Sequence, residues 1–60
     1  MDMDMPKDSA ILLSVVNMKL RDFYKDLDAL CDDLEWSRSE IEEKLSAIAY
    51  KYDEVRNQFV

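Results

Sequence analysis

The spacing of apolar positions predicts a first helix over about residues 9–24. At 100° per residue its apolar side chains form one broad stripe, made of Leu12, Leu13, Val16, Leu20, Phe23 and Tyr24. Asp8 or Ser9 is expected to cap the helix, because its side-chain oxygen accepts from backbone N–H groups of the first turn. Pro6 separates this pattern from a head, residues 1–7, that we expect to be flexible.

A second apolar stripe, made of Ile11, Val15 and Met18, lies nearly opposite the first. A surface helix normally has one apolar stripe and a polar back, so two stripes require two neighbours. An exposed apolar patch commonly marks an interaction site. We therefore predict that these three residues form a surface for a protein partner, either a two-fold mate in a homodimer or an unidentified hetero-partner. The alternative is that the N-terminal head folds back over the stripe within one chain.

Two shorter helices are predicted over about residues 27–34 and 38–48. Asp26 is a favourable cap for the first of them. The segment Ser37-Arg38-Ser39-Glu40 is a capping box, in which the first and last residues satisfy each other's exposed N–H groups. Trp36 and Ile41 have the spacing of a hydrophobic staple across this helix start.

After Ala49 the pattern alternates, which predicts a β-hairpin over about residues 50–60. We favour the register that pairs Tyr52 with Phe59, because it puts Tyr50 and both of these rings on one face. The predicted fold is a mainly α, three-helix, helix-turn-helix-like domain over residues 8–60, closed by a short C-terminal hairpin. This is the outline of a miniature winged helix.

The charge distribution argues against nucleic acid as the partner. The 60-residue chain has a net charge of −6, and residues 26–43 carry eight acidic side chains against Arg38 alone. A DNA-reading helix needs cations for phosphates and Arg, Lys, Asn or Gln for base edges. A degenerate winged-helix-type nucleic-acid-binding protein therefore remains only the alternative to a protein–protein interaction or assembly module.

The sequence offers no equipment for catalysis. It has one cysteine, Cys31, and neither histidine nor glycine, which excludes an internal disulfide, a Cys/His zinc site and a Gly-rich phosphate loop. We expect Cys31 to be a core residue, and the acidic cluster Asp28, Asp32 and Asp33 to be a solvated helix face rather than a Ca²⁺ site. The chain is thus predicted not to be an enzyme and to have no cofactor, metal or small-molecule substrate.

The ends and apolar runs of the sequence predict a cytoplasmic protein without a membrane partner. The acidic start, Met1-Asp2-Met3-Asp4, is unlike the basic start of a signal peptide. The longest apolar run, Ala10-Ile11-Leu12-Leu13, is too short to cross a bilayer. A single thiol fits a reducing compartment.

Several segments together resemble a known family. They are Pro6-Lys7-Asp8, Ile11-Leu12-Leu13-Ser14-Val15-Val16-Asn17, Lys19-Leu20-Arg21-Asp22, Leu27-Asp28-Ala29-Leu30-Cys31, Tyr50-x-Tyr52-Asp53 and Asn57-x-Phe59-Val60. Over about residues 5–60 the chain is similar to very small bacterial proteins of gut anaerobes classed as a domain of unknown function. The chain departs from that pattern at Ala49, where the family has glycine, and at Trp36-Ser37, where it has an aliphatic-Asp pair. The resemblance implies a bacterial cytoplasmic origin and transfers no site.

Overall fold

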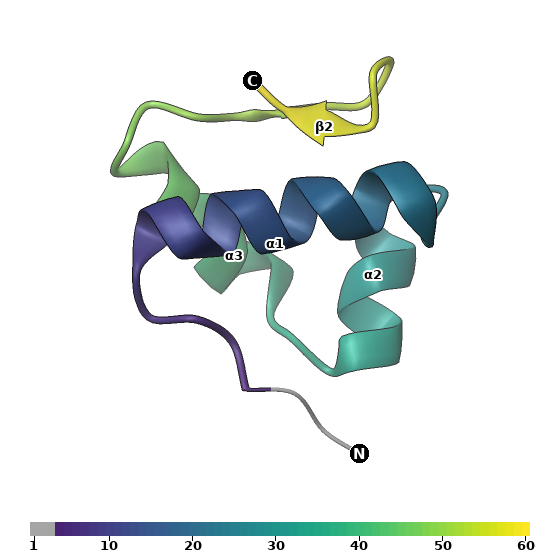
Figure 1. Cartoon of the computed structure of the whole chain (residues 1–60), viewed down its shortest axis with the longest axis horizontal. Helices are drawn as coiled ribbons and strands as arrows, with labels where there is room; N and C mark the ends of the chain where they lie inside the picture. The colour runs from purple at the N-terminus through teal and green to yellow at the C-terminus, as the bar shows by residue number, and fades with distance from the viewer. Residues whose placement is uncertain (1–3) are drawn as a thin grey trace.

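The computed structural model describes residues 4–60 and confirms three helices followed by a short antiparallel hairpin. In chain order the elements are α1 (Ser9–Asp22), α2 (Leu27–Leu34), α3 (Arg38–Ser46), β1 (Tyr52–Asp53) and β2 (Gln58–Phe59). α1 is central: it contacts α2, α3 and β2. The hairpin runs along one side of α1, and the two shorter helices lie on the other side (Figure 1).

Every helix begins at a side-chain cap, as the sequence predicts. The caps are Asp8, Asp26 and Ser37. Of the two candidates before α1, Asp8 is the one that accepts from the first turn, and Ser9 is already helical. Ser37 Oγ accepts from the backbone N–H of Glu40 at 3.3 Å, which is the forward half of the capping box.

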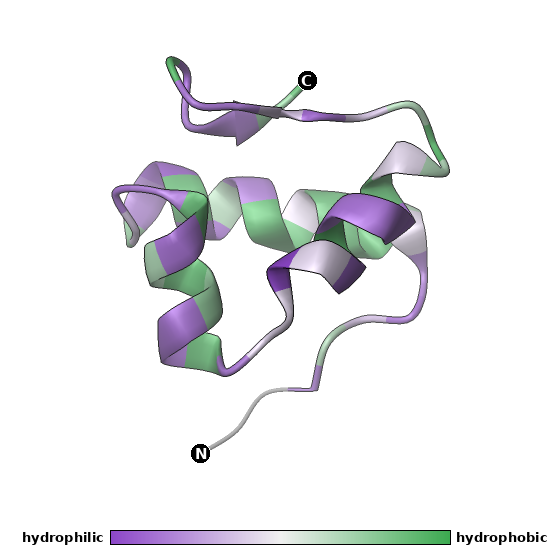
Figure 2. Cartoon of the chain, turned by 180° about the vertical axis from the view of Figure 1, so that it is seen from behind, coloured by the Kyte–Doolittle hydropathy of each residue, from purple (hydrophilic) through white to green (hydrophobic). Residues whose placement is uncertain are grey.

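A single apolar core forms where the three helices and β2 meet. It consists of Leu12, Val16, Leu20, Leu27, Leu30, Cys31, Trp36, Ile41, Leu45 and Phe59. Along the helices hydrophobic residues alternate with hydrophilic ones, the pattern of amphipathic helices packed on a shared core (Figure 2). The accessible surface is 4177 Å², close to the ~4,100 Å² typical of a folded monomer of this mass. The core side chains are thus covered within one chain.

α1 ends two residues earlier than the spacing predicts, and this changes the position of Phe23. The helix stops at Asp22, and Phe23 leaves helical geometry with φ −127°. Its N–H still bonds to the carbonyl of Lys19 at 2.8 Å, but its ring is 70% exposed. The prediction that Phe23 belongs to the buried stripe was wrong, because the helical angle stops applying at the end of the helix.

α3 ends at Ser46, earlier than expected, through a left-handed turn at Ala49 (φ 66°). The N–H of Ala49 bonds to the carbonyl of Ser46, and the N–H of Tyr50 bonds to the carbonyl of Leu45, both at 2.9 Å. These are the two hydrogen bonds of a Schellman helix end, at which glycine is preferred. An alanine in this conformation costs about 1 kcal/mol or more. The turn sends the chain back toward β1.

Replacing Ala49 with glycine is expected to stabilise the protein by about 0.5–1 kcal/mol, because the steric cost of the left-handed turn exceeds the added entropy of the unfolded chain. Urea unfolding followed by circular dichroism measures this change. Ala47→Gly is the matched control: Ala47 is exposed and right-handed (φ −61°), so this change should lose roughly 0.5–1 kcal/mol. Equal losses in both variants would contradict the role given to Ala49.

Candidate functional site

The hairpin has the predicted register. Tyr52 pairs with Phe59 and Asp53 with Gln58. The rings of Tyr52 and Phe59 lie 5.5 Å apart, centroid to centroid, at an interplanar angle of 50°. This is a favourable tilted contact, and it joins β1 to the core through Phe59.

The side-chain amide of Asn17 holds β2 against α1. Its Nδ2 donates to the carbonyl of Phe59 at 3.1 Å, and its Oδ1 accepts from the N–H of Phe59 at 2.8 Å. Gln58 adds a bond from its Nε2 to the carbonyl of Asn17 at 3.0 Å. The outward backbone groups of Phe59 are thus satisfied by a helix side chain, where a third strand would otherwise bind.

A second amide, that of Asn57, ties the hairpin to the end of α1. Asn57 is left-handed (φ 54°), and its Nδ2 donates to the carbonyls of Leu20 and Tyr24 at 3.0 and 2.9 Å. Its Oδ1 accepts from the hydroxyl of Tyr52 at 2.7 Å. That hydroxyl also accepts from the N–H of Leu27, the first residue of α2, at 3.1 Å. We call the side chains of Asn17, Asn57, Gln58 and Tyr52 the amide clamp.

The clamp fixes which flank of α1 the hairpin covers, and the stripe predicted as an interaction surface lies on another flank. Ile11 is 57% exposed and Met18 is 38% exposed. Val15 is half-buried and packs against the core, as does Met5 from the head. The stripe therefore has two outward side chains and one that leans inward.

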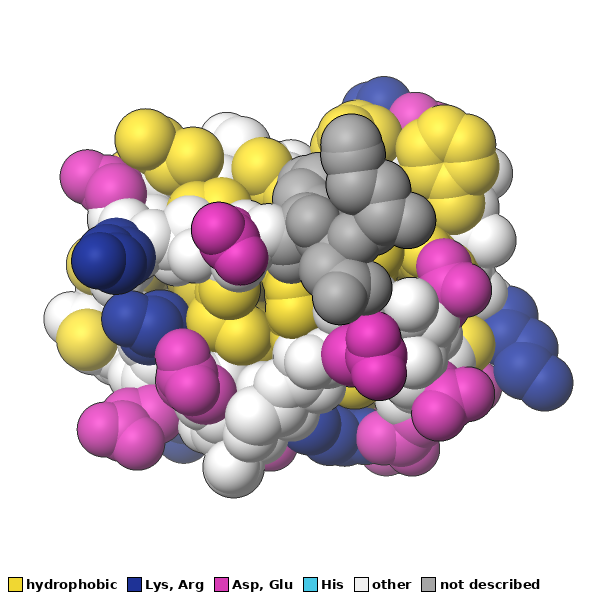
Figure 3. Space-filling view, turned by 90° about the horizontal axis from the view of Figure 1, so that it is seen from below, with side chains coloured by type: hydrophobic (Ala, Val, Ile, Leu, Met, Phe, Trp, Pro, Cys, Tyr) yellow, Lys and Arg dark blue, Asp and Glu magenta, His cyan; other side chains and the backbone are white. Residues whose placement is uncertain are grey.

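The alternative prediction, a head that covers the stripe, falls partly on residues 1–3, which lie outside the described residues. With the described part of the head in place, Ile11 and Met18 still have the exposed fractions given above. Hydrophobic side chains reach the surface among acidic ones on the face shown in Figure 3.

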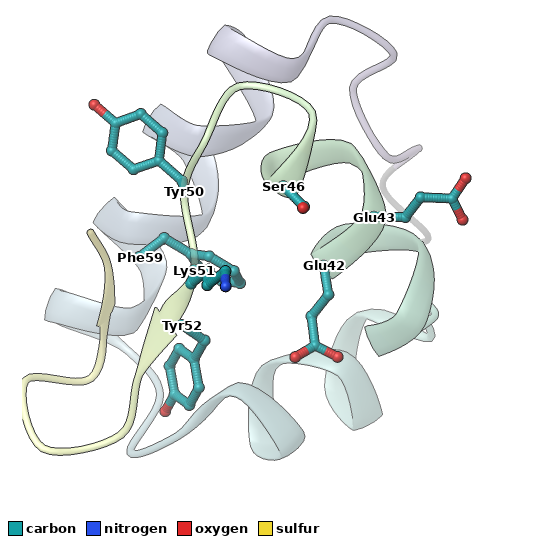
Figure 4. Close-up of a pocket in the computed structure, with 7 residues that line it drawn as sticks. All are labelled: Glu42, Glu43, Ser46, Tyr50, Lys51, Tyr52 and Phe59. Carbon is teal, nitrogen blue, oxygen red and sulfur yellow. The ribbon is translucent and has the colours of Figure 1, made fainter.

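A hollow of about 480 Å³ opens between α3 and β1. Its lining residues are Glu42, Glu43, Ser46, Tyr50, Lys51, Tyr52 and Phe59. Figure 4 shows β1 along one side and α3 along the other. The carboxylate of Glu42 reaches into the space between them, whereas Glu43 points outward from α3. The sequence did not predict this hollow, because its two sides come together only in the folded chain.

Arg38 is held by acidic neighbours at the start of α3. Its guanidinium lies 2.8 Å from an Asp28 carboxylate oxygen and 3.5 Å from one of Glu42. It also sits 5.5 Å from the centre of the Tyr52 ring. The hydrogen bond to Asp28 raises the pKa of Arg38 above its ordinary value. This cation is thus engaged within the chain.

Cys31 is buried in the core, as its helical spacing predicts. Burial raises the pKa of the thiol; the charge of Arg38 opposes this, and the carboxylates of Asp28 and Glu42 add to it. A raised pKa leaves little thiolate, which is the reactive form.

Across residues 4–60, no group of three or more His, Cys, Asp or Glu side chains has an arrangement that would hold a metal ion. None of the helices there combines the length and apolar character needed to cross a bilayer.

Comparison with known proteins identified a family. The family described as Domain of unknown function (DUF4250) matches residues 6–59. Neither the comparison with curated proteins nor that with solved structures gave a match.

The Cys31 thiol is expected to react with iodoacetamide far more slowly in the native protein than in urea at mildly alkaline pH. Burial keeps the reagent away from the thiol, and the raised pKa keeps the thiol protonated. Mass spectrometry of the alkylated fraction over time measures the two rates. Similar rates would show that the thiol is accessible and would contradict its place in the core.

Proposed function

We propose that this chain, which belongs to the family described as Domain of unknown function (DUF4250), is a protein–protein interaction or assembly module. Family membership carries no activity, so the proposal stands on the chain itself. The observation that supports it best is the exposure of Ile11 and Met18 on a flank of α1 that the hairpin leaves uncovered. We take the partner to be a second copy of the chain.

Two-fold symmetry suits this stripe. Ile11 and Met18 lie two helical turns apart with Val15 between them. If two α1 helices pack antiparallel about an axis midway along the stripe, each Ile11 meets the partner's Met18. Closed two-fold pairing is the commonest form of self-association, and it covers both exposed side chains at once.

The association is expected to be weak and concentration-dependent. The protomer already has the accessible surface of a folded monomer of its mass, so folding does not require the second copy. A single helix face contributes less than the ~1,200 Å² that stable complexes usually bury. The module therefore exchanges between a folded monomer and a dimer.

Charge supports a protein partner rather than a nucleic acid. The helix that would read DNA in a winged helix, α3, exposes Glu40, Glu42 and Glu43. The guanidinium of Arg38, at the start of the same helix, is paired with Asp28 and Glu42. A phosphate backbone would meet a negative field there.

Replacing Ile11 with aspartate is expected to weaken self-association by about tenfold or more, because it places a charge in an apolar contact. Sedimentation equilibrium over a range of concentrations measures this, and circular dichroism checks that helicity is kept. Val55→Asp is the matched control, since Val55 is an apolar residue that is 96% exposed in the hairpin turn, outside the α1 stripe. Val15→Asp is a poorer test, because Val15 also packs on the core.

Two results would contradict the proposal. One is a wild-type protein that stays monomeric at about 1 mM, where even weak specific pairing is visible. The other is an equal loss of association in Ile11→Asp and Val55→Asp, which would point to a general effect of charge rather than to this stripe.

A further inference from the structure

The outer edge of β1 has backbone groups directed away from the hairpin. Lys51 and Val60 exchange both of their backbone hydrogen bonds, at 3.0 and 2.9 Å. In an antiparallel pair such residues alternate with residues whose N–H and C=O point outward, which here are Tyr52 and Phe59. Asn17 occupies the outward groups of Phe59. The backbone N–H and C=O of Tyr52 point outward at the opposite edge of the hairpin.

That edge borders the hollow between β1 and α3. Tyr52 and Lys51 line one side of it, and Glu42 and Ser46 of α3 line the other (Figure 4). Exposed strand edges bind extended peptides by adding a strand, with main-chain bonds for affinity and flanking side chains for selectivity. The hairpin has one edge closed by a side chain and one edge beside an open groove.

We propose that this groove binds an extended, basic segment of a partner protein, which adds as a strand to β1 at Tyr52. The inference does not depend on the α1 stripe. In such a strand alternate side chains face the same way. One set would lie over the aromatic lining, which includes Tyr50 and Phe59, and the other would face α3, from which the carboxylate of Glu42 reaches into the groove.

Charge selects this occupant over a second copy of the chain. On the α3 side, the carboxylate of Glu42 reaches into the groove, 3.5 Å from Arg38, and Glu43 lies at the outer rim. Lys51 lies on the strand side, and the whole chain carries −6. Pairing two β1 edges would bring two sets of these glutamates together, and like charges disfavour such contacts. A segment rich in Lys or Arg would meet a complementary field. The shortness of β1 and the charged Lys51 beside it protect this edge from indiscriminate pairing.

The probe is a fluorescein-labelled, end-blocked peptide, Lys-Val-Lys-Val-Lys, titrated into the full chain to about 2 mM. Fluorescence anisotropy measures binding, and ¹⁵N–¹H correlation spectra locate it. The expected result is saturable binding, with the largest shifts at the Tyr52 amide and along Glu42–Ser46. The same peptide with alternate amides N-methylated cannot donate strand hydrogen bonds, so it should bind at least about tenfold more weakly.

Paired variants test the charge selection. Removing both carboxylates in Glu42→Gln/Glu43→Gln should weaken binding about threefold to tenfold, because exposed ion pairs are individually weak. Asp32→Asn/Glu35→Gln removes the same charge from exposed positions at the end of α2, and should change binding less than about twofold. Lys51→Gln removes the like charge and should tighten binding by about two- to fivefold.

Several outcomes would overturn the proposal. They are an absence of binding at the highest peptide concentration, equal binding of the N-methylated peptide, equal effects of the two double variants, and shifts confined to α1. The last of these would show that the α1 stripe, and not the β1 edge, takes extended peptides.

Discussion

The side-chain amide of Asn17 hydrogen-bonds the outer edge of β2, where a third strand would otherwise pair. The arrangement of the whole chain depends on this contact. A two-stranded hairpin is marginal in water, and this one has only two residues in each strand. Bonds from Asn17 to Phe59 and from Asn57 to the end of α1 attach it to the helix. Phe59 is thereby held in the core, where it is 2% exposed.

The clamp also gives a physical reason for the segments on which the family resemblance is based. Tyr52, Asn57 and Phe59 lie in the tail of that pattern, and Asn17 lies in its first helix. Asn17, Asn57 and Phe59 make or receive the bonds that join the hairpin to α1, and Tyr52 bonds to Asn57 and to the first residue of α2. We infer that these four residues mainly preserve the fold, so function is better sought on the surfaces that the clamp leaves open.

Local features were predictable from the sequence, and features built between distant segments were not. The caps at Asp8, Asp26 and Ser37 depend on neighbouring residues, and the hairpin register follows from alternation near the turn. The role of Asn17 could not be predicted from its neighbours, because its partner Phe59 lies 42 residues away. Likewise, the helical angle alone predicts which residues belong to the stripe. It does not predict that Val15 is half-buried, because that depends on packing against the core.

Amide hydrogen exchange at Phe59 tests the central claim most directly. This N–H points away from β1, and its acceptor is the side-chain oxygen of Asn17. If the clamp holds the hairpin, its exchange should be as slow as that of core amides in α1, since both open only with global unfolding. Exchange as fast as that of surface turn amides, such as the Val55 N–H that bonds to Asp53 Oδ1 on the exposed side of the turn, would show that the hairpin detaches on its own, and would contradict the account.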